Sequence, residues 1–246
     1  MKYLLIIALI IFFIFTCTCE CPYGGQKSNF ALTFDCGNDY QRLCLIGQFA
    51  PGKSVTLLSS KNSKIFRART GGSFMYFFEP GDNDIPLTYL KLDNCQDPHQ
   101  YFLAYFGTGQ VKYQLLELSL FEEKSKVRNF DSIVRRKKLL EYEASVLTSP
   151  SPKVFSLPVS RKNVLIGQYE AKGRDGYGPL FMSAKGKVEM IHFLASVYRA
   201  FRLNGRLYLM FNWRGSWEGS GYQGSALVEL TESGFKLIFE DDSWST

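Results

Sequence analysis

The chain has 246 residues, of which 46% are hydrophobic, 15% aromatic and 21% charged, and its formal net charge is +6. This length and apolar content allow a substantial buried core and argue against intrinsic disorder, which goes with few aromatic residues and a high net charge. The mild positive charge permits contact with an anionic surface. No aromatic-basic recognition motif accompanies it, so we expect no nucleic-acid binding.

The first 19 residues predict a secretory signal peptide. Lys2 supplies a charged start, residues 4–15 are an unbroken run of twelve apolar residues, and small and polar residues follow. Twelve residues span only about 18 Å as a helix, whereas the hydrocarbon core of a membrane is roughly 30 Å thick. We therefore expect a secreted, periplasmic or envelope protein rather than one held by a transmembrane anchor.

Cys17 offers an alternative form of processing, in which this cysteine is lipidated and holds the protein on a membrane surface. Phe15 is bulky at a position where lipoprotein signals usually have a small residue. Lipidation would also leave five further cysteines, an odd number, whereas cleavage after Cys19 leaves four. The even count favours simple cleavage.

Four cysteines in an exported chain predict two disulfides. Cys36 and Cys44 flank a Gly-Asn-Asp cluster that favours a turn, so they are placed to join two hairpin strands. Cys21 and Cys95 remain as the second pair, which would tie the mature N-terminus to the body. The cysteine spacings do not match a zinc site and only two histidines are present, so we expect no metal and no cofactor.

Residues 20–128 are predicted to form a first β module. Short runs of apolar, aromatic and β-branched residues alternate there with turns rich in Gly, Pro, Asn and Asp. The expected strands are residues 53–58, 74–78, 101–106 and 111–121. Residues 107–110, with the sequence Gly-Thr-Gly-Gln, predict a hairpin between the last two.

Residues 129–158 are predicted to form a helix and a Pro-rich linker. Asp131 is placed to cap this helix. The residues expected on one face of the helix are Ile133, Leu140, Ala144 and Leu147. Pro150 and Pro152 end the helix, and the chain up to Pro158 is expected to be an extended connection.

Residues 159–246 are predicted to form a second β module. The expected strands are residues 164–169, 188–193, 197–201, 206–211, 226–230 and 235–239. Asn204-Gly205 is the clearest two-residue hairpin turn in the chain.

Matched segments in the two modules suggest an internal duplication. Leu-Ile-Gly-Gln occurs at residues 45–48 and again at 165–168. Three further matches keep the same order, and they pair residues 74–75 with 181–182, 101–106 with 207–211, and 115–119 with 227–231. The alternative is that β-rich segments share apolar patterns by composition. The expected fold class is therefore all-β, mainly antiparallel, with one connecting helix and two similar β modules.

The most unusual segment is a glycine-rich loop that carries Trp213, Trp217 and Tyr222. Aromatic faces with polar neighbours suit sugar rings or the surface of a protein partner. The alternative is that both tryptophans fold back onto the sheet as a lid.

The densest basic run consists of Arg135, Arg136, Lys137 and Lys138. Its functional interpretation is an electrostatic dock for an acidic partner or an anionic membrane surface. A solvated helix face explains the same pattern more simply.

No catalytic signature is present, so we expect a non-enzymatic binding protein that recognises an unidentified protein or a surface glycan. Contact with a membrane surface, through the basic run, would be weak. Glu117 and Glu229 occupy matching positions in the proposed repeats and would be the carboxylates of a hydrolase, the competing class. A third alternative is a structural component of the cell envelope.

Overall fold

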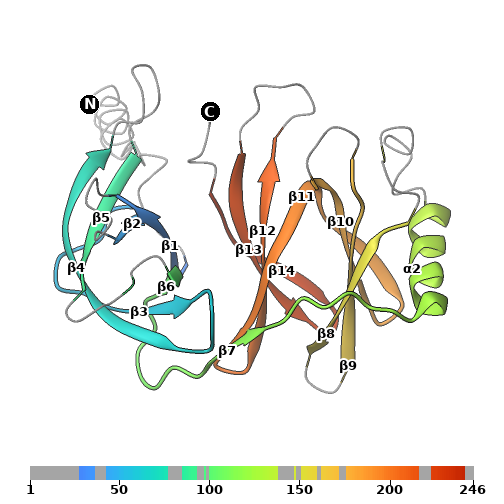
Figure 1. Cartoon of the computed structure of the whole chain (residues 1–246), viewed down its shortest axis with the longest axis horizontal. Helices are drawn as coiled ribbons and strands as arrows, with labels where there is room; N and C mark the ends of the chain where they lie inside the picture. Colours follow the sequence, from blue (N-terminus) through green and yellow to red (C-terminus); the bar gives the residue numbers. More distant parts are fainter. Residues whose placement is uncertain are drawn as a thin grey trace, which may run out of the picture.

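The computed structural model describes residues 28–36, 43–76, 85–92, 97, 100–137, 147, 151–159, 162–171, 176–215 and 223–241. Two antiparallel β bodies lie side by side, and a helix covers the outer side of the second body (Figure 1). The predicted fold class, mainly antiparallel β with one helix, is confirmed for this part of the chain.

The first body is a closed six-stranded barrel with the strand order β1-β2-β5-β4-β3-β6. Its strands are β1 (Phe30–Asp35), β2 (Leu43–Ile46), β3 (Ser54–Ser59), β4 (Ile65–Tyr76), β5 (Ile85–Lys91) and β6 (Tyr101–Tyr105). Alternate residues point inwards, so Val55 and Leu57 of β3 meet Leu45 and Ala68 in the interior. Closure pairs both edges of every strand and leaves no open edge.

A glycine bulge in β4 helps to close the barrel. The register between β4 and β5 shifts between Thr70 and Ser73, with Gly71 and Gly72 in between. A Cβ atom on Gly71 would lie 2.0 Å from the ring of Tyr89, so only glycine fits there. Such a bulge bends its strand, and β4 thereby pairs with β3 along one half and with β5 along the other.

The second body is an eight-stranded sheet in which β8 to β14 follow one another as a meander and β7 pairs with β11. Its strands are β7 (Tyr113–Leu116), β8 (Lys153–Val159), β9 (Lys162–Gln168), β10 (Gly178–Ala184), β11 (Lys187–Leu203), β12 (Arg206–Arg214), β13 (Gln223–Thr231) and β14 (Gly234–Asp241). The 17-residue β11 pairs with β10 along its first half and with β12 and β7 along its second half. Side chains from β8 to β13 meet in one core.

The predicted Asn204-Gly205 turn is confirmed. It joins β11 to β12, and both residues have positive φ angles, 51° and 82°. These angles are those of the primed turns that match the twist of a hairpin. The Asn204 side chain also accepts a 2.9 Å hydrogen bond from the amide of Lys112, which holds the chain leading into β7 against the turn.

The predicted hairpin between residues 101–106 and 111–121 is wrong. β6 pairs with β1 and β3, whereas β7 pairs with β11 of the other body. Residues 107–112 therefore connect the two bodies. Barrel closure occupies both edges of β6, so no edge is left for the strand that follows it.

The predicted linker contains a strand. β8 pairs with β9 along its whole length, although it includes Pro158. Because β8 is the last strand in the order of the sheet, a residue without a backbone donor is tolerated in it. How the chain divides into folding units, at residues 128 and 158 or elsewhere, stays a prediction.

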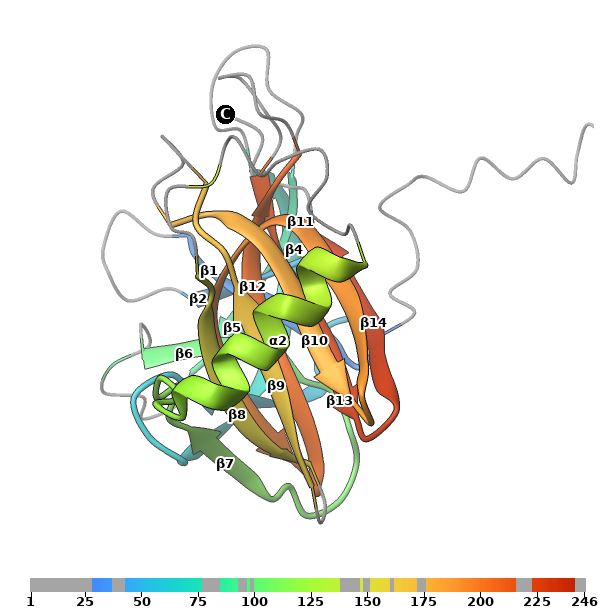
Figure 2. The same cartoon turned by 90° about the vertical axis from the view of Figure 1, so that its right-hand side faces the viewer.

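The helix α2 (Lys124–Arg136) begins seven residues earlier than Asp131, the residue predicted to cap it. Glu123 occupies the N-cap position and makes no side-chain capping hydrogen bond. Phe130 and Val134 are buried against the sheet, which the helix crosses in Figure 2. Leu147 forms a bridge with Ala171 instead of continuing the helix, and Leu140 and Ala144 lie outside the described residues.

Asp131 fastens the helix to the sheet instead of capping it. The hydroxyl of Tyr169 donates a 2.7 Å hydrogen bond to Asp131 Oδ1, and Arg135 Nε donates to both carboxylate oxygens at 3.0 and 2.9 Å. Gly167 makes room for the helix, because a Cβ atom there would lie 2.2 Å from the ring of Phe130.

The internal duplication is not confirmed. The barrel and the meander have different strand orders, and the glycines of the repeated Leu-Ile-Gly-Gln segment have different surroundings. Gly47 follows β2 with a φ of 116°, whereas Gly167 lies within β9 under Phe130. Gln48 is exposed, while Gln168 is buried and accepts a hydrogen bond from the amide of Val197.

One hydrophobic cluster joins the two bodies. Its buried members are Phe30, Leu32, Leu58, Leu103, Val111, Tyr113, Phe201, Leu203, Tyr208, Met210 and Leu227. The hydroxyl of Tyr113 in the sheet donates a 2.6 Å hydrogen bond to the carbonyl of Ser59 in the barrel. The barrel is therefore packed against one face of the sheet.

The predicted Cys36–Cys44 disulfide is present and joins the ends of β1 and β2. Cys17, Cys19, Cys21 and Cys95 lie outside the described residues, as does the predicted signal peptide. No helix in the described ranges is both long enough and apolar enough to span a membrane.

Candidate ligand-binding cleft

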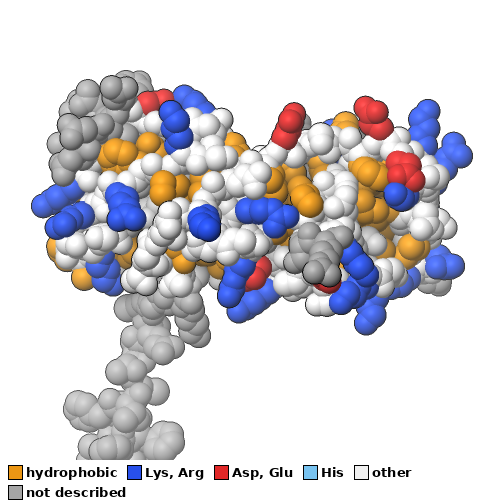
Figure 3. Space-filling model, turned by 90° about the horizontal axis from the view of Figure 1, so that it is seen from below, with side chains coloured by type: hydrophobic (Ala, Val, Ile, Leu, Met, Phe, Trp, Pro, Cys, Tyr) orange, Lys and Arg blue, Asp and Glu red, His pale blue; other side chains and the backbone are white. Residues whose placement is uncertain are grey.

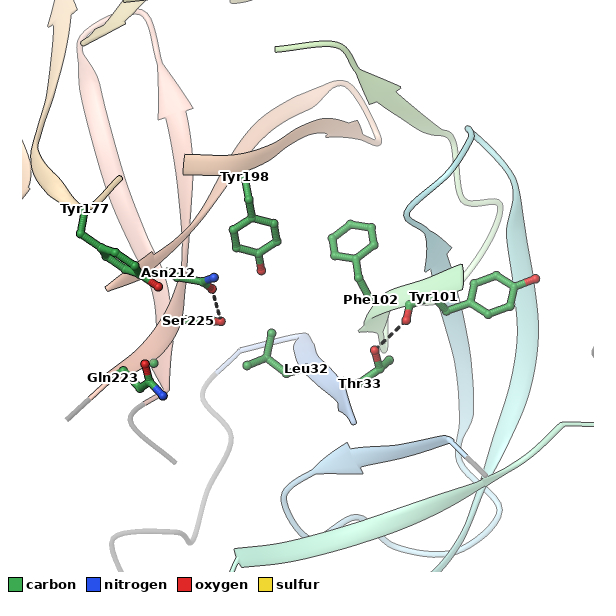
Figure 4. Close-up of a pocket in the computed structure, with 10 residues that line it drawn as sticks. Leu32, Thr33, Tyr101, Phe102, Tyr177, Tyr198, Asn212, Gln223 and Ser225 are labelled. Carbon is green, nitrogen blue, oxygen red and sulfur yellow. Dashed lines mark hydrogen bonds between the residues drawn. The ribbon is translucent and has the colours of Figure 1, made fainter. Parts of the chain in front are cut away.

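A cleft of about 470 Å³ opens where the barrel meets the sheet (Figure 4). β1 and β6 form its barrel wall, and β11, β12 and β13 form its sheet wall. The lining residues are Leu32, Thr33, Tyr101, Phe102, Tyr177, Tyr198, Asn212, Gln223, Gly224 and Ser225. Its volume falls within the usual range for small-molecule sites, about 300–1,000 Å³.

Aromatic rings form the two facing walls of the cleft. Tyr198 of β11 and Phe102 of β6 face each other across it, and Tyr177 lies beside them on the sheet side (Figure 4). The Arg199 guanidinium lies 4.4 Å from the ring centroid of Phe102 and 5.6 Å from that of Tyr198. Such cation–π contacts hold the facing rings in place.

The hydroxyl of Tyr198 stays protonated. Its oxygen lies 3.7 Å from Met210 Sδ, and burial raises the pKa of Tyr198 to about 12. Tyr198 as a whole is 37% exposed, so part of this residue is open to a ligand in the cleft. Tyr198 therefore presents a neutral, amphipathic surface throughout the physiological pH range.

Amide groups supply the polar part of the cleft. Asn212 Oδ1 accepts a 2.9 Å hydrogen bond from Ser225 Oγ, which orients the amide. Neither the Asn212 nitrogen nor the Gln223 side chain has a hydrogen-bond partner in the part of the chain that the structure describes. By contrast, Thr33 already donates to the carbonyl of Tyr101 at 2.9 Å. Both amides are thus available to hydroxyl groups of a ligand.

The lining combines aromatic faces with side-chain amides. Aromatic faces can accept the C–H surface of a ring, and amides can pair with its hydroxyl groups. None of the ten lining residues carries a carboxylate or an imidazole.

Trp213 does not point into this cleft. Its side chain is 8% exposed and packs in the core of the sheet, where the indole nitrogen has no hydrogen-bond partner. This position corresponds to the alternative in which the tryptophan folds onto the sheet. Trp217 and Tyr222 lie outside the described residues, so their role in binding stays a prediction.

The loop predicted to bind borders the cleft. Asn212 precedes Trp213, and Gln223 and Gly224 follow the loop, and all three line the cleft. Tyr177, Tyr198 and Phe102 carry no sequence signal that distinguishes them from core aromatics. Only the docking of the barrel on the sheet brings them together.

The basic run lies at the far end of the sheet from the cleft (Figure 1). Arg135 is paired with Asp131 at 2.9 Å. Arg136 and Lys137 are exposed and form no ion pair within the described ranges, and Lys138 lies outside them. Docking of this run on an anionic surface stays a prediction.

Glu117 and Glu229 do not form a close carboxylate pair. Glu229 lies opposite Tyr208, Tyr208 opposite Phe201, and Phe201 opposite Leu115, two residues before Glu117. Three strand spacings put the backbones of Glu229 and Leu115 roughly 14 Å apart, and Glu117 lies two residues further along the chain. The two carboxylates of glycosidases are only about 5–9.5 Å apart. Glu229 instead pairs with Arg206 at 3.4 Å.

No group of three or more potential metal ligands occurs in the described ranges. Comparison of the chain with protein-family models, with curated proteins and with solved structures finds no match.

Proposed function

We propose that this is an exported, non-enzymatic binding protein whose cleft between barrel and sheet takes a carbohydrate. The observation that carries the proposal is the pairing of aromatic surface on Tyr198 and Phe102 with the free amide nitrogen of Asn212 and the free amide of Gln223, within the described residues. A sugar ring has an apolar C–H face and a rim of hydroxyl groups, and it needs this combination.

The size of the cleft favours a glycan over a protein as its occupant. A standard protein–protein interface buries about 800 Å² on each partner and involves some 20–30 residues a side. The cleft is lined by ten residues and holds about 470 Å³, which suits one or two sugar rings.

Two observations support export. The charged start and the apolar run of residues 4–15 have the form of a signal peptide. The Cys36–Cys44 disulfide is a bond that persists in oxidising compartments and is rare in the cytosol. We propose that the protein acts in the periplasm, in the envelope or outside the cell.

Glycan binding by the wild type and by Tyr198→Ala and Asn212→Ala variants tests the proposal. A glycan array identifies a binding saccharide, and titration calorimetry then measures its Kd. We expect each variant to bind about five- to tenfold more weakly, because each loses a stacking surface or a hydrogen-bond donor worth about 1–1.4 kcal/mol.

Phe74→Ala is the matched control. Phe74 is 38% exposed, similar to Tyr198, but it lies on β4 and does not line the cleft. Its removal should leave the Kd unchanged. Absence of glycan binding by the wild type, or equal Kd values in wild type and both cleft variants, would contradict the proposal.

A further inference from the structure

The outer face of the barrel carries three cations on neighbouring strands. Arg69 of β4 lies directly opposite Ser54 of β3 on one side and Lys91 of β5 on the other. Arg67, two residues earlier in β4, lies opposite Thr56. Cross-strand partners and residues two apart point to the same face of a sheet, so all five side chains share one face.

These side chains line a groove of about 500 Å³. Its other rim is the segment formed by Gly107, Thr108 and Gly109, which leaves the barrel after β6. Gly109 has a φ of 91°. A Cβ atom added at this position would have no other atom within 4 Å, so the segment borders open space. The groove is concave and lies on other strands than the aromatic cleft.

The charges in the groove are not neutralised by the protein. Arg67, Arg69 and Lys91 are exposed, and none of them forms an ion pair with an acidic side chain in the described ranges. Arg69 and Lys91 are like charges directly opposite each other, an arrangement that destabilises a strand pair. Figure 3, which views the molecule from below, likewise shows Lys and Arg side chains prominent on the barrel.

A hydroxyl adds a second polar feature to the same groove. Thr56 lines the groove, and its hydroxyl has no hydrogen-bond partner among the residues that the structure describes. This hydroxyl is therefore available to a ligand that enters the groove. An oxygen atom that entered the groove between Arg67 and Thr56 would accept hydrogen bonds from both.

We propose that this groove binds the sulfate or phosphate ester group of a larger ligand. Such a group offers three oxygens in a compact tetrahedron and so can accept from two guanidiniums, an ammonium and a hydroxyl together. Arg is suited to this task because its donors form a rigid fork. A membrane surface suits the groove less well, because a flat array of headgroups favours protruding cations over a concave site. The site goes beyond the proposed function and does not depend on the aromatic cleft.

The test compares the full protein with the double variant Arg67→Gln/Arg69→Gln. The matched control is Lys162→Gln/Lys187→Gln, which removes the same charge from exposed positions in the sheet that form no ion pair in the described ranges. The probes are a sulfated tetrasaccharide, its desulfated counterpart, inorganic phosphate, and vesicles that contain phosphatidylglycerol. Calorimetry or co-sedimentation measures binding, and circular dichroism checks the fold.

We expect the sulfated tetrasaccharide to bind the wild type and the control equally, and to bind the Arg67→Gln/Arg69→Gln variant at least about tenfold more weakly. The desulfated probe should not bind in this groove in the wild type, in the groove variant or in the control variant. Inorganic phosphate should raise the Tm of the wild type above its value in chloride of equal ionic strength, and should not raise that of the variant.

Three outcomes overturn the proposal. Equal losses in the groove variant and the control would mean that only net charge matters. Equal affinity for the sulfated and desulfated probes would mean that no oxyanion is recognised. Binding to vesicles that the groove variant weakens, without binding to either soluble oxyanion, would assign the groove to a membrane surface. If the double variant fails to fold, Lys91→Gln is measured in its place, with Lys187→Gln as its control.

Discussion

At the scale of single residues, His192 is the titratable group whose surroundings most clearly affect stability. Its ring stacks on Phe193 with centroids 4.9 Å apart and also contacts Phe211 and Trp213. Its Nδ1 accepts a 3.1 Å hydrogen bond from the amide of Leu194, which fits the neutral ring. Burial lowers the pKa of His192 below its usual value, although Glu240 lies 3.7 Å from Nε2.

This lowered pKa makes stability depend on pH. Below about 6.5 the unfolded chain takes up a proton that the folded His192 resists, so the contribution of His192 is present above this pH and is lost as the pH falls towards the folded pKa. We expect the free energy of unfolding to fall between pH 7.5 and pH 5, by at most about 1.4 kcal/mol per pH unit from this group.

Urea denaturation of the wild type and of His192→Asn at several pH values measures the effect. Asparagine keeps an acceptor for the Leu194 amide but does not titrate in this range. The difference in stability between the two proteins should therefore shrink as the pH falls. A difference that stays constant from pH 7.5 to pH 5 would contradict the assignment.

At the scale of elements, Asp131 attaches α2 to the sheet, although its sequence position predicts a helix cap. Asp131 is a typical capping residue, but the helix extends past it, and its carboxylate binds the buried Tyr169 hydroxyl at 2.7 Å. Sequence periodicity predicted a helix that overlaps α2 only in its last turns. It missed the start, where Glu123 makes no capping hydrogen bond, and it extended the helix to Leu147, which forms a bridge instead. Packing against the sheet sets its position.

Asp131→Ala should destabilise the protein by about 1–3 kcal/mol, because it leaves the buried Tyr169 hydroxyl without an acceptor. Arg135→Ala removes only the exposed side of the same network and should cost at most about 1 kcal/mol. Chemical denaturation of both variants measures the difference. Equal costs, or a larger cost for Arg135→Ala, would mean that the link to Tyr169 does not hold the helix.

The exposed basic residues that follow in α2 lead to a separate prediction. If they dock to an anionic surface, Arg136→Glu/Lys137→Glu should reduce co-sedimentation with anionic liposomes at low salt, since each basic residue contributes about 1 kcal/mol there. High salt should abolish binding by the wild type. The fold should remain intact, because both side chains are exposed. No binding at low salt would leave these residues as a solvated helix face.

At the scale of the whole molecule, the barrel and the sheet share one hydrophobic cluster, and we expect them to unfold together. Trp213 lies in the core of the sheet, so its exposure on unfolding changes the tryptophan fluorescence, whereas far-ultraviolet circular dichroism reports on both bodies. The two signals should follow the same denaturation curve. Tyr113→Phe, which removes the 2.6 Å hydrogen bond to Ser59, should lower the midpoint of both curves together. Separate midpoints would show that the bodies are independent.

The amino-acid sequence by itself determined the features that depend on neighbours in the chain. Short runs of apolar, aromatic and β-branched residues predicted strands such as β3, β6, β9, β12, β13 and β14. Asn204-Gly205 predicted its hairpin, because a turn depends on the φ angles of two residues. Cys36 and Cys44 were close enough in sequence for their pairing to be inferred.

Only the tertiary structure decided which strands pair and which side chains meet. In the closed barrel both edges of β6 are paired, so β7 pairs with β11 of the sheet instead. The turn signal at residues 107–110 had predicted a β6–β7 hairpin. Trp213 lies buried in the core of the sheet. Leu32 and Ser225, which are far apart in the chain, line the same cleft. The physical reason is that burial and strand pairing depend on contacts between residues far apart in the chain, whose energies outweigh local turn preferences.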